Sequence, residues 1–187
     1  MEQPCNTFLR TGMPLPEMSS PEILSPEMQA PEIHQIWQCL HQIADPELPV
    51  LSITDLGMIR AVTPMQNGWR VTFTPTYSGC PATEYLINAI QETLTQAGFA
   101  PVDIEVNLTP AWTTDWMNAD AKQRLREFGI APPQGLACEK PAELEPILCP
   151  RCGSHTTEKI SEFGSTACKA LYRCQQCLEP FDYFKCI

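Results

Sequence analysis

The sequence WRVTFTPTYSGCPATEYLINAIQETLTQAGF, residues 69–99, decides the fold of the larger part of the chain. Its first five residues alternate apolar and polar side chains, with Val71 and Phe73 among the apolar ones, which is the period of a half-buried strand. Farther on, apolar residues recur every three or four positions, as they do along one face of a helix. Gly98 then supplies the left-handed residue that ends many helices. The stretch predicts a strand, a corner and a helix over residues 82–97.

The residues before this stretch predict a hairpin and a first helix. Asn67-Gly68 lies between two apolar runs, Met58–Met65 and Trp69–Thr76, and Asn-Gly is the favoured pair of a two-residue primed turn. Upstream of the hairpin, helical spacing predicts a helix whose inner face carries Ile33, Ile36, Trp37, Leu40 and Ile43. Asp45-Pro46 stops this helix, because proline disfavours the α conformation of the residue before it.

The residues after the stretch complete a small α/β fold. Val102, Ile104, Val106 and Leu108 alternate as a strand, which a right-handed crossover should place parallel to the strand before the helix. A last helix is predicted over residues 118–128 and ends at Gly129. The fold class is therefore α/β in the mixed α+β sense. Its order is α-β-β-α-β-α, with helices on a three-stranded mixed sheet.

The length of 187 residues allows one domain of ordinary size and a small satellite module. Prolines at 21, 26 and 31 mark a repeated five-residue unit that can sustain neither a helix nor a sheet. The predicted parts are a flexible Pro/Glu-rich arm over 1–32, an α/β domain over 33–130, a linker over 131–147 and a zinc ribbon over 148–187.

Two C-x₂-C pairs in the last part of the chain predict a metal site. The pairs are separated by 21 residues, close to the spacing of four-cysteine zinc sites, and their members are Cys149, Cys152, Cys174 and Cys177. Structural Zn²⁺ is the preferred ion, whereas a single iron or an iron–sulfur cluster is the alternative, since four thiolates also suit these. The same module contains three further residues that are either alternate metal ligands or structural side chains of the core or surface: Cys168, Cys186 and His155.

Cys80 is the second cysteine of interest, because it stands between the strand and the helix of residues 69–99. Pro81 favours the first helical position, so Cys80 is the predicted N-cap, where the helix dipole should lower the thiol pKa and allow ligation of a soft metal. The alternative is a small residue in a crowded turn. The carboxylates of Asp45, Glu47 and Asp55 are interpreted as turn and cap residues.

Composition and charge favour a cytoplasmic protein that binds other proteins. No apolar run approaches the ~18 residues of a membrane span, and the N-terminus lacks the features of a signal peptide. Residues 149–187 carry five Lys or Arg and four Asp or Glu, which leaves seven basic against 18 acidic residues before them. An acidic body repels phosphate backbones, so nucleic-acid binding is not expected.

Three segments resemble the MIP18, or DUF59, family of iron–sulfur assembly proteins: DPELPVLSITDLGMI (45–59), TPTYSGCPATEYL (74–86) and TPAWTTDWM (109–117). With the ribbon that ends FGSTACKALYRCQQCLEPFDYFKCI (163–187), the whole chain resembles the D proteins of bacterial phenylacetate-degradation operons. This resemblance implies a reactive cysteine at Cys80 that takes part in iron–sulfur handling. It also implies work beside phenylacetyl-CoA 1,2-epoxidase, a di-iron oxygenase that receives electrons from a flavin and ferredoxin-type reductase.

Three functional hypotheses follow. The first is a non-catalytic accessory protein that assembles, delivers or repairs the iron or iron–sulfur centres of that epoxidase system, with Cys80 as a transient cluster ligand. The second is a stoichiometric subunit of the epoxidase complex that docks through the ribbon, and the remote third is a zinc-ribbon nucleic-acid binder. The sequence contains no Ser/His/Asp set, Gly-rich phosphate loop or H-E-x-x-H motif, which disfavours an independent enzyme. Expected partners are the oxygenase and reductase subunits, and a homodimer is an open alternative.

Overall fold

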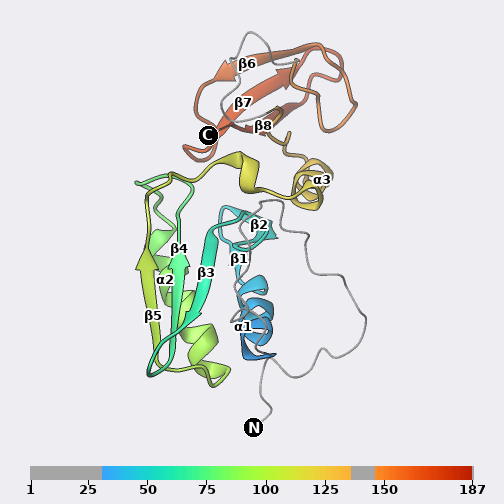
Figure 1. Cartoon of the computed structure of the whole chain (residues 1–187). Helices are drawn as coiled ribbons and strands as arrows, with labels where there is room; N and C mark the ends of the chain where they lie inside the picture. Colours follow the sequence, from blue (N-terminus) through green and yellow to red (C-terminus); the bar gives the residue numbers. More distant parts are fainter. Residues whose placement is uncertain (1–30, 136–145, 187) are drawn as a thin grey trace. The chain divides into compact units, whose positions relative to one another are not determined.

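The computed structural model of the chain describes residues 31–135 and 146–186. Residues 1–30 of the predicted arm and most of the predicted linker lie outside the described residues. The last two residues of the predicted arm, Pro31 and Glu32, instead form the start of a helix, because proline is favoured in the first turn. The chain divides into two compact units between Ala111 and Trp112, called here the α/β unit and the ribbon unit. Figure 1 labels their helices and strands.

The α/β unit contains the predicted three-stranded mixed sheet. Its strands are β3 (Ile59–Pro64), β4 (Trp69–Phe73) and β5 (Val102–Val106), in the order β3-β4-β5. Strand β3 is antiparallel to β4, whereas β5 is parallel to it, as the crossover through a helix requires. Val71 and Phe73 are fully buried, which confirms the face that the alternation predicts as inward.

The turn between β3 and β4 differs from the prediction. The hairpin is present, but its loop has four residues closed by a hydrogen bond from the Met65 amide to the Gly68 carbonyl at 3.0 Å. Gly68 is left-handed with φ +93°, whereas a primed two-residue turn also needs a positive φ at Asn67, which is absent. Glycine is required at position 68 by a tertiary contact, because a Cβ there would overlap the carbonyl oxygen of Pro101.

Two helices, α1 (Pro31–His41) and α2 (Thr83–Gln96), contact each other and the sheet (Figure 1). Most buried residues follow the predicted spacing: Ile33, Ile36 and Leu40 in α1 and Leu86, Ile90 and Leu94 in α2. Cys39 is buried as well, whereas Trp37, predicted on the inner face, is half-buried. Gly98 is left-handed with φ +90°, and the Phe99 amide donates to the Leu94 carbonyl at 2.9 Å. This is the C-terminal stop that the sequence predicts.

A short hairpin after α1 was not predicted. Strands β1 (Ala44–Asp45) and β2 (Leu48–Ser52) pair antiparallel. The Asp45 carboxylate accepts hydrogen bonds from the amides of Glu47 and Leu48 at 2.8 and 3.0 Å, which supports the interpretation of Asp45 as a turn residue. The hairpin follows directly on the helix that Asp45-Pro46 was expected to stop.

The ribbon unit begins with a 3₁₀ turn, η2 (Thr114–Trp116), and the helix α3 (Ala119–Phe128). The Asn118 side chain accepts a hydrogen bond from the Ala121 amide at 2.6 Å, and Gly129 is left-handed, so both ends of α3 lie where the sequence predicts them. Every helix within the described ranges is too short or too polar to cross a bilayer.

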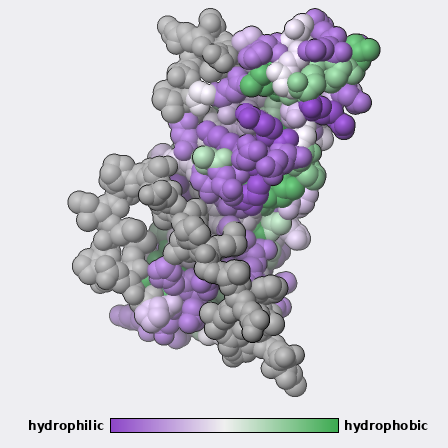
Figure 2. Space-filling model, turned by 90° about the vertical axis from the view of Figure 1, so that its right-hand side faces the viewer, coloured by the Kyte–Doolittle hydropathy of each residue, from purple (hydrophilic) through white to green (hydrophobic). Residues whose placement is uncertain are grey.

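Three antiparallel strands form the ribbon sheet: β6 (Thr157–Ser161), β7 (Lys169–Cys174) and β8 (Pro180–Phe184), in the order β6-β7-β8. Figure 2 shows apolar surface on the ribbon, and its exposed large hydrophobic residues are Ile160, Phe163 and Leu178.

The division between units falls before α3, whereas the sequence places the end of the α/β domain at residue 130. Two contacts explain the difference. Ala131 exchanges backbone hydrogen bonds with Asp182 and Phe184 at 2.8 and 2.9 Å, and the Trp112 ring meets the Phe184 ring edge to face at 6.1 Å. The residues around α3 are thus fixed to the ribbon sheet, a pairing that local sequence patterns do not reveal.

Candidate functional site

The two C-x₂-C segments form tight knuckles at one end of the ribbon. The first precedes β6 and the second joins β7 to β8. Each knuckle is followed by a left-handed residue, Gly153 with φ +72° and Leu178 with φ +64°. For leucine this conformation costs roughly 1–2 kcal/mol, because Cβ crowds the carbonyl oxygen.

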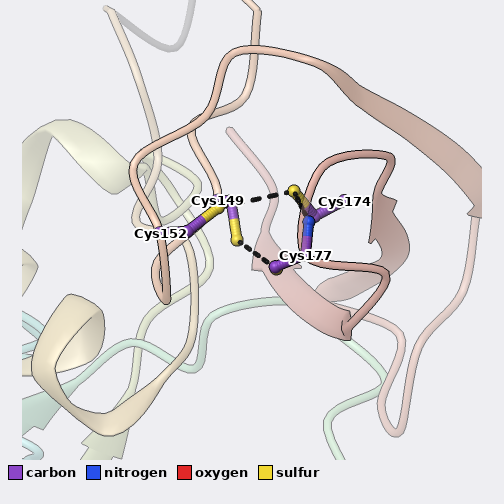
Figure 3. Close-up of side chains that lie close together, drawn as sticks. All are labelled: Cys149, Cys152, Cys174 and Cys177. Carbon is purple, nitrogen blue, oxygen red and sulfur yellow. Dashed lines mark hydrogen bonds between the residues drawn. The ribbon is translucent and has the colours of Figure 1, made fainter.

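The four predicted ligand cysteines converge on one point (Figure 3). The sulfur atoms of Cys149 and Cys177 lie 3.8 Å apart, those of Cys152 and Cys174 lie 3.6 Å apart, and all four sulfurs fall within 4.8 Å of one another. A tetrahedral ion with Zn–S bonds of about 2.3 Å separates its ligands by about 3.8 Å. A disulfide would need about 2.05 Å, so the cysteines are free thiols spaced for a tetrahedral metal.

Backbone amides of the second knuckle favour the thiolate that a metal needs. The amides of Gln176 and Cys177 donate to the Cys174 sulfur at 3.4 and 3.5 Å. The Cys177 amide, and after it that of Gln176, outweigh desolvation and lower the pKa of the Cys174 thiol to about 6. The donor set of four sulfurs and the spacing both fit Zn²⁺.

The other candidate ligands of the ribbon do not join this group. Among the described residues the cluster consists of the four cysteines alone. Cys168 is buried and lies 3.0 Å from the Thr166 hydroxyl, whereas Cys186 donates to the Gln134 carbonyl at 3.0 Å. His155 is exposed and is outside the cluster.

Cys80 lies at the predicted corner, but it does not cap the helix. The N-cap of α2 is Ala82, which makes no side-chain capping hydrogen bond. Cys80 instead begins a preceding turn, in which its carbonyl accepts the Thr83 amide at 3.2 Å. The prediction of an N-cap is therefore wrong by two residues, because Pro81 and Ala82 occupy this extra turn.

The surroundings of Cys80 also reverse the predicted direction of its pKa. The residue is only 8% exposed. Burial raises the pKa of the Cys80 thiol, and a hydrogen bond from the Ala82 amide opposes this. The charges of Glu47 and Asp45 raise the pKa further, whereas a hydrogen bond with Thr76 lowers it. Because the raising effects prevail, the ground state is a protonated thiol beside two carboxylates.

The structure therefore adds Asp45, Glu47 and Thr76 to the site. From the sequence, Asp45 and Glu47 are interpreted as turn and cap residues, and Thr76 is placed at the end of a strand. The sequence did contain a pattern that could have identified these three residues. They lie in the two segments, 45–59 and 74–86, that carry the resemblance to iron–sulfur assembly proteins.

Ser52, His41 and Asp55 also come together in the α/β unit, although the sequence shows no catalytic set. The Ser52 hydroxyl donates to the Asp55 carboxylate at 2.7 Å and lies 3.1 Å from Nδ1 of His41. The Asp55 carboxylate lies 4.0 Å from the same nitrogen. A nucleophilic triad places serine and aspartate on opposite ring nitrogens, so this cluster is a structural network around β2.

Comparison with protein families matches two models to the chain. Residues 33–108 match the iron–sulfur cluster assembly protein family, which ends close to the boundary between the two units. Residues 136–185 match the PaaD zinc beta ribbon domain, which contains all four ligand cysteines.

A curated protein of Escherichia coli (strain K12), provisionally named as the D subunit of 1,2-phenylacetyl-CoA epoxidase, is 65% identical over 156 residues. The match covers 83% of this chain and 93% of the relative. Among solved structures, a DUF59 domain of unknown function from Bacillus anthracis is 26% identical, with a TM-score of 0.47, over 49% of this chain and 89% of that one. A conserved hypothetical protein of Thermotoga maritima is 24% identical, with a TM-score of 0.42, over 48% of this chain and 89% of that one. The match along nearly the whole length of the E. coli relative shows that the chain belongs to the family of epoxidase D proteins, in which an iron–sulfur cluster assembly domain is fused to a PaaD zinc β-ribbon.

Proposed function

We propose that this protein is a non-catalytic accessory factor that assembles, delivers or repairs the iron or iron–sulfur centres of the phenylacetyl-CoA 1,2-epoxidase system. The observation that carries the proposal is the environment of Cys80: a nearly buried thiol with two carboxylates and two hydrogen-bonding groups around it. Cys80 is the transient ligand, and iron or a cluster is the cargo.

The chemistry of this environment suits temporary binding. The carboxylates of Asp45 and Glu47 attract a cation, and they also keep the free thiol protonated. When iron approaches, the thiol proton leaves to solvent and an iron–sulfur bond forms. The Ala82 amide and the Thr76 hydroxyl then stabilise the thiolate. Because protons compete with iron for this sulfur, the cargo is held less firmly than at a thiol with a low pKa.

The ribbon has a separate role in this proposal. Its four cysteines are spaced for a permanent ion that supports a fold too small to be stable by its apolar core alone. When bound, Zn²⁺ supplies folding free energy and no redox chemistry. The ribbon is therefore the scaffold and dock, and the α/β unit carries the cargo.

The test is reconstitution without air. Purified reductase and oxygenase components, stripped of iron, are incubated with iron, sulfide and either wild-type, Cys80→Ser or Cys80→Ala protein. We expect wild-type protein to restore cluster and iron content faster than either variant, with matching thermal unfolding of all three proteins as the control for folding. Equal metal content and equal epoxidase activity with all three would refute the role of Cys80.

The second candidate is a fixed-ratio, non-catalytic component of the epoxidase complex, and the name of the E. coli relative favours it, because that name contains the word subunit. Under this hypothesis Cys80 is structural and the ribbon is a docking module. Sedimentation of the mixed components distinguishes the two candidates. A stable complex of fixed ratio supports the second, whereas weak, substoichiometric association supports the accessory factor.

A further inference from the structure

The two cysteine knuckles follow the same backbone path but end in different residues. In each, the amide of the first cysteine, Cys149 or Cys174, donates to the carbonyl five residues later, at 3.0 Å in both cases. Gly153 and Leu178 therefore occupy equivalent positions, and both are left-handed, with φ +72° and +64°. The first knuckle meets this requirement with glycine, which has no Cβ to crowd the backbone.

Leucine is a poor choice for this position on two independent grounds. Leu178 is the one non-glycine residue with a positive φ among residues 31–135 and 146–186. Its side chain is also 61% exposed, so the ribbon core gains little from it. An unfavourable backbone conformation that carries an exposed apolar side chain points to a contact outside the chain.

We propose that Leu178 is the docking residue of the ribbon and that it inserts into an apolar pocket on the oxygenase component. This inference rests on the proposed function and adds the contact through which the protein reaches its target. Exposed polar residues surround it: Gln176, Glu179 and Gln175, whose side-chain amide donates to the Glu158 carboxylate at 3.0 Å. An apolar anchor with a polar rim is the usual anatomy of a protein interface.

Charge favours a partner protein over a second copy of this chain. Residues 149–187 carry five basic and four acidic residues, whereas the preceding residues carry seven basic and 18 acidic ones. Two copies would bring two strongly acidic bodies together. The nearly neutral ribbon is the part of the chain that can approach another protein with the least repulsion.

The other exposed hydrophobic residues of the ribbon do not show this combination. Phe163 is 63% exposed, but the Lys185 ammonium lies 4.6 Å from the centre of its ring, so it has a partner within the chain. Ile160 is 53% exposed on the edge strand β6, and its φ is not positive. Ile160 therefore provides a matched control for exposed apolar area.

The experiment separates docking from folding. Binding of the full-length, zinc-loaded protein to the purified oxygenase component is measured by calorimetry for wild type, Leu178→Gly, Leu178→Met and Ile160→Thr. We expect Leu178→Gly to keep its zinc and to unfold at the same or a higher temperature, because glycine suits the left-handed conformation. It should nevertheless bind at least about tenfold more weakly, as expected for the loss of a hot-spot side chain.

The controls define what would overturn the inference. Leu178→Met keeps an apolar side chain and should bind within about threefold of wild type, and Ile160→Thr should bind as wild type does. Equal binding of Leu178→Gly and wild type would refute the docking role and leave the proposed function intact. Loss of zinc from Leu178→Gly would refute it as well, because Leu178 would then be structural. If wild type itself failed to bind the oxygenase component, this inference would fail, whereas the proposed function would still be decided by the reconstitution of the reductase and the oxygenase.

Discussion

Replacement of Cys152 by serine separates the contribution of the metal from that of packing. Cys152 is the exposed member of the four-cysteine cluster, so Cys152→Ser removes a ligand without opening a cavity in the core. Cys174, in contrast, belongs to the buried core of the ribbon, where any substitution also disturbs packing. We expect Cys152→Ser to weaken zinc binding and to destabilise the ribbon sheet, while the stability of the α/β unit is unchanged.

The expected loss of zinc affinity follows from the geometry of the four-cysteine site. Two sulfur separations, 3.6 and 3.8 Å, nearly equal the separation of about 3.8 Å in a tetrahedral zinc–thiolate site, and all four sulfurs lie within 4.8 Å of one another. Binding therefore needs at most a contraction of the cluster by about 1 Å. Structural zinc sites in small domains contribute about 10–16 kcal/mol, or about 2.5–4 kcal/mol per ligand if the four share it equally. At about 1.4 kcal/mol per tenfold change, zinc affinity should fall about 60- to 700-fold.

The assay combines metal analysis with hydrogen exchange on protein purified without air. Zinc affinity is measured by competition with a chromophoric chelator, and exchange is compared between β7 and β4, which lie in separate units. Exchange protection of β7 should fall, whereas that of β4 should be retained. The control is Cys168→Ala, which alters a buried cysteine outside the cluster and should keep its zinc. Wild-type zinc affinity and wild-type β7 protection in Cys152→Ser would refute the four-thiolate site.

Three further predictions concern the glycines of the α/β unit, the surroundings of Cys80 in the same unit, and helix α3 of the ribbon unit. Gly68→Ala should lower the free energy of unfolding by about 3 kcal/mol in urea titrations, because φ is +93° and the new Cβ has no room. The control is Gly98→Ala, which has open space around it and should cost about 1 kcal/mol. Equal losses would contradict the close approach of the Pro101 backbone to Gly68. Glu47→Gln removes a negative charge that raises the pKa of Cys80, so this pKa should fall. Alkylation of Cys80 at pH 8, followed by mass spectrometry, should then become faster. An unchanged dependence of the alkylation rate on pH would exclude the Glu47 carboxylate as a cause of the raised pKa. Asn118→Ala removes the N-cap of α3 and should cost about 1 kcal/mol in thermal unfolding, with no change in zinc content.

Much of the fold could be predicted because its signals are local. The left-handed stops at Gly98 and Gly129, the cap at Asn118 and the parallel pairing of β4 with β5 depend on spacing and on residues a few positions apart. The four ligand cysteines belong to the same class, because two C-x₂-C pairs at that separation have few other uses. The cytoplasmic location, the arm, the linker, the possibility of a homodimer and the lack of nucleic-acid binding stay predictions.

Only the tertiary structure decided the features that depend on distance through space. The pKa of Cys80 is raised first because the thiol is buried, and second because Glu47 and Asp45, more than 30 residues away in sequence, lie near it. The sequence pattern indicated only the adjacent helix. The sequence by itself indicated most of the helices and strands and the four cysteines that come together, since these follow from short-range geometry. The structure determined which groups surround the Cys80 thiol and where Leu178 is placed, because burial and charge act between residues that only folding brings together.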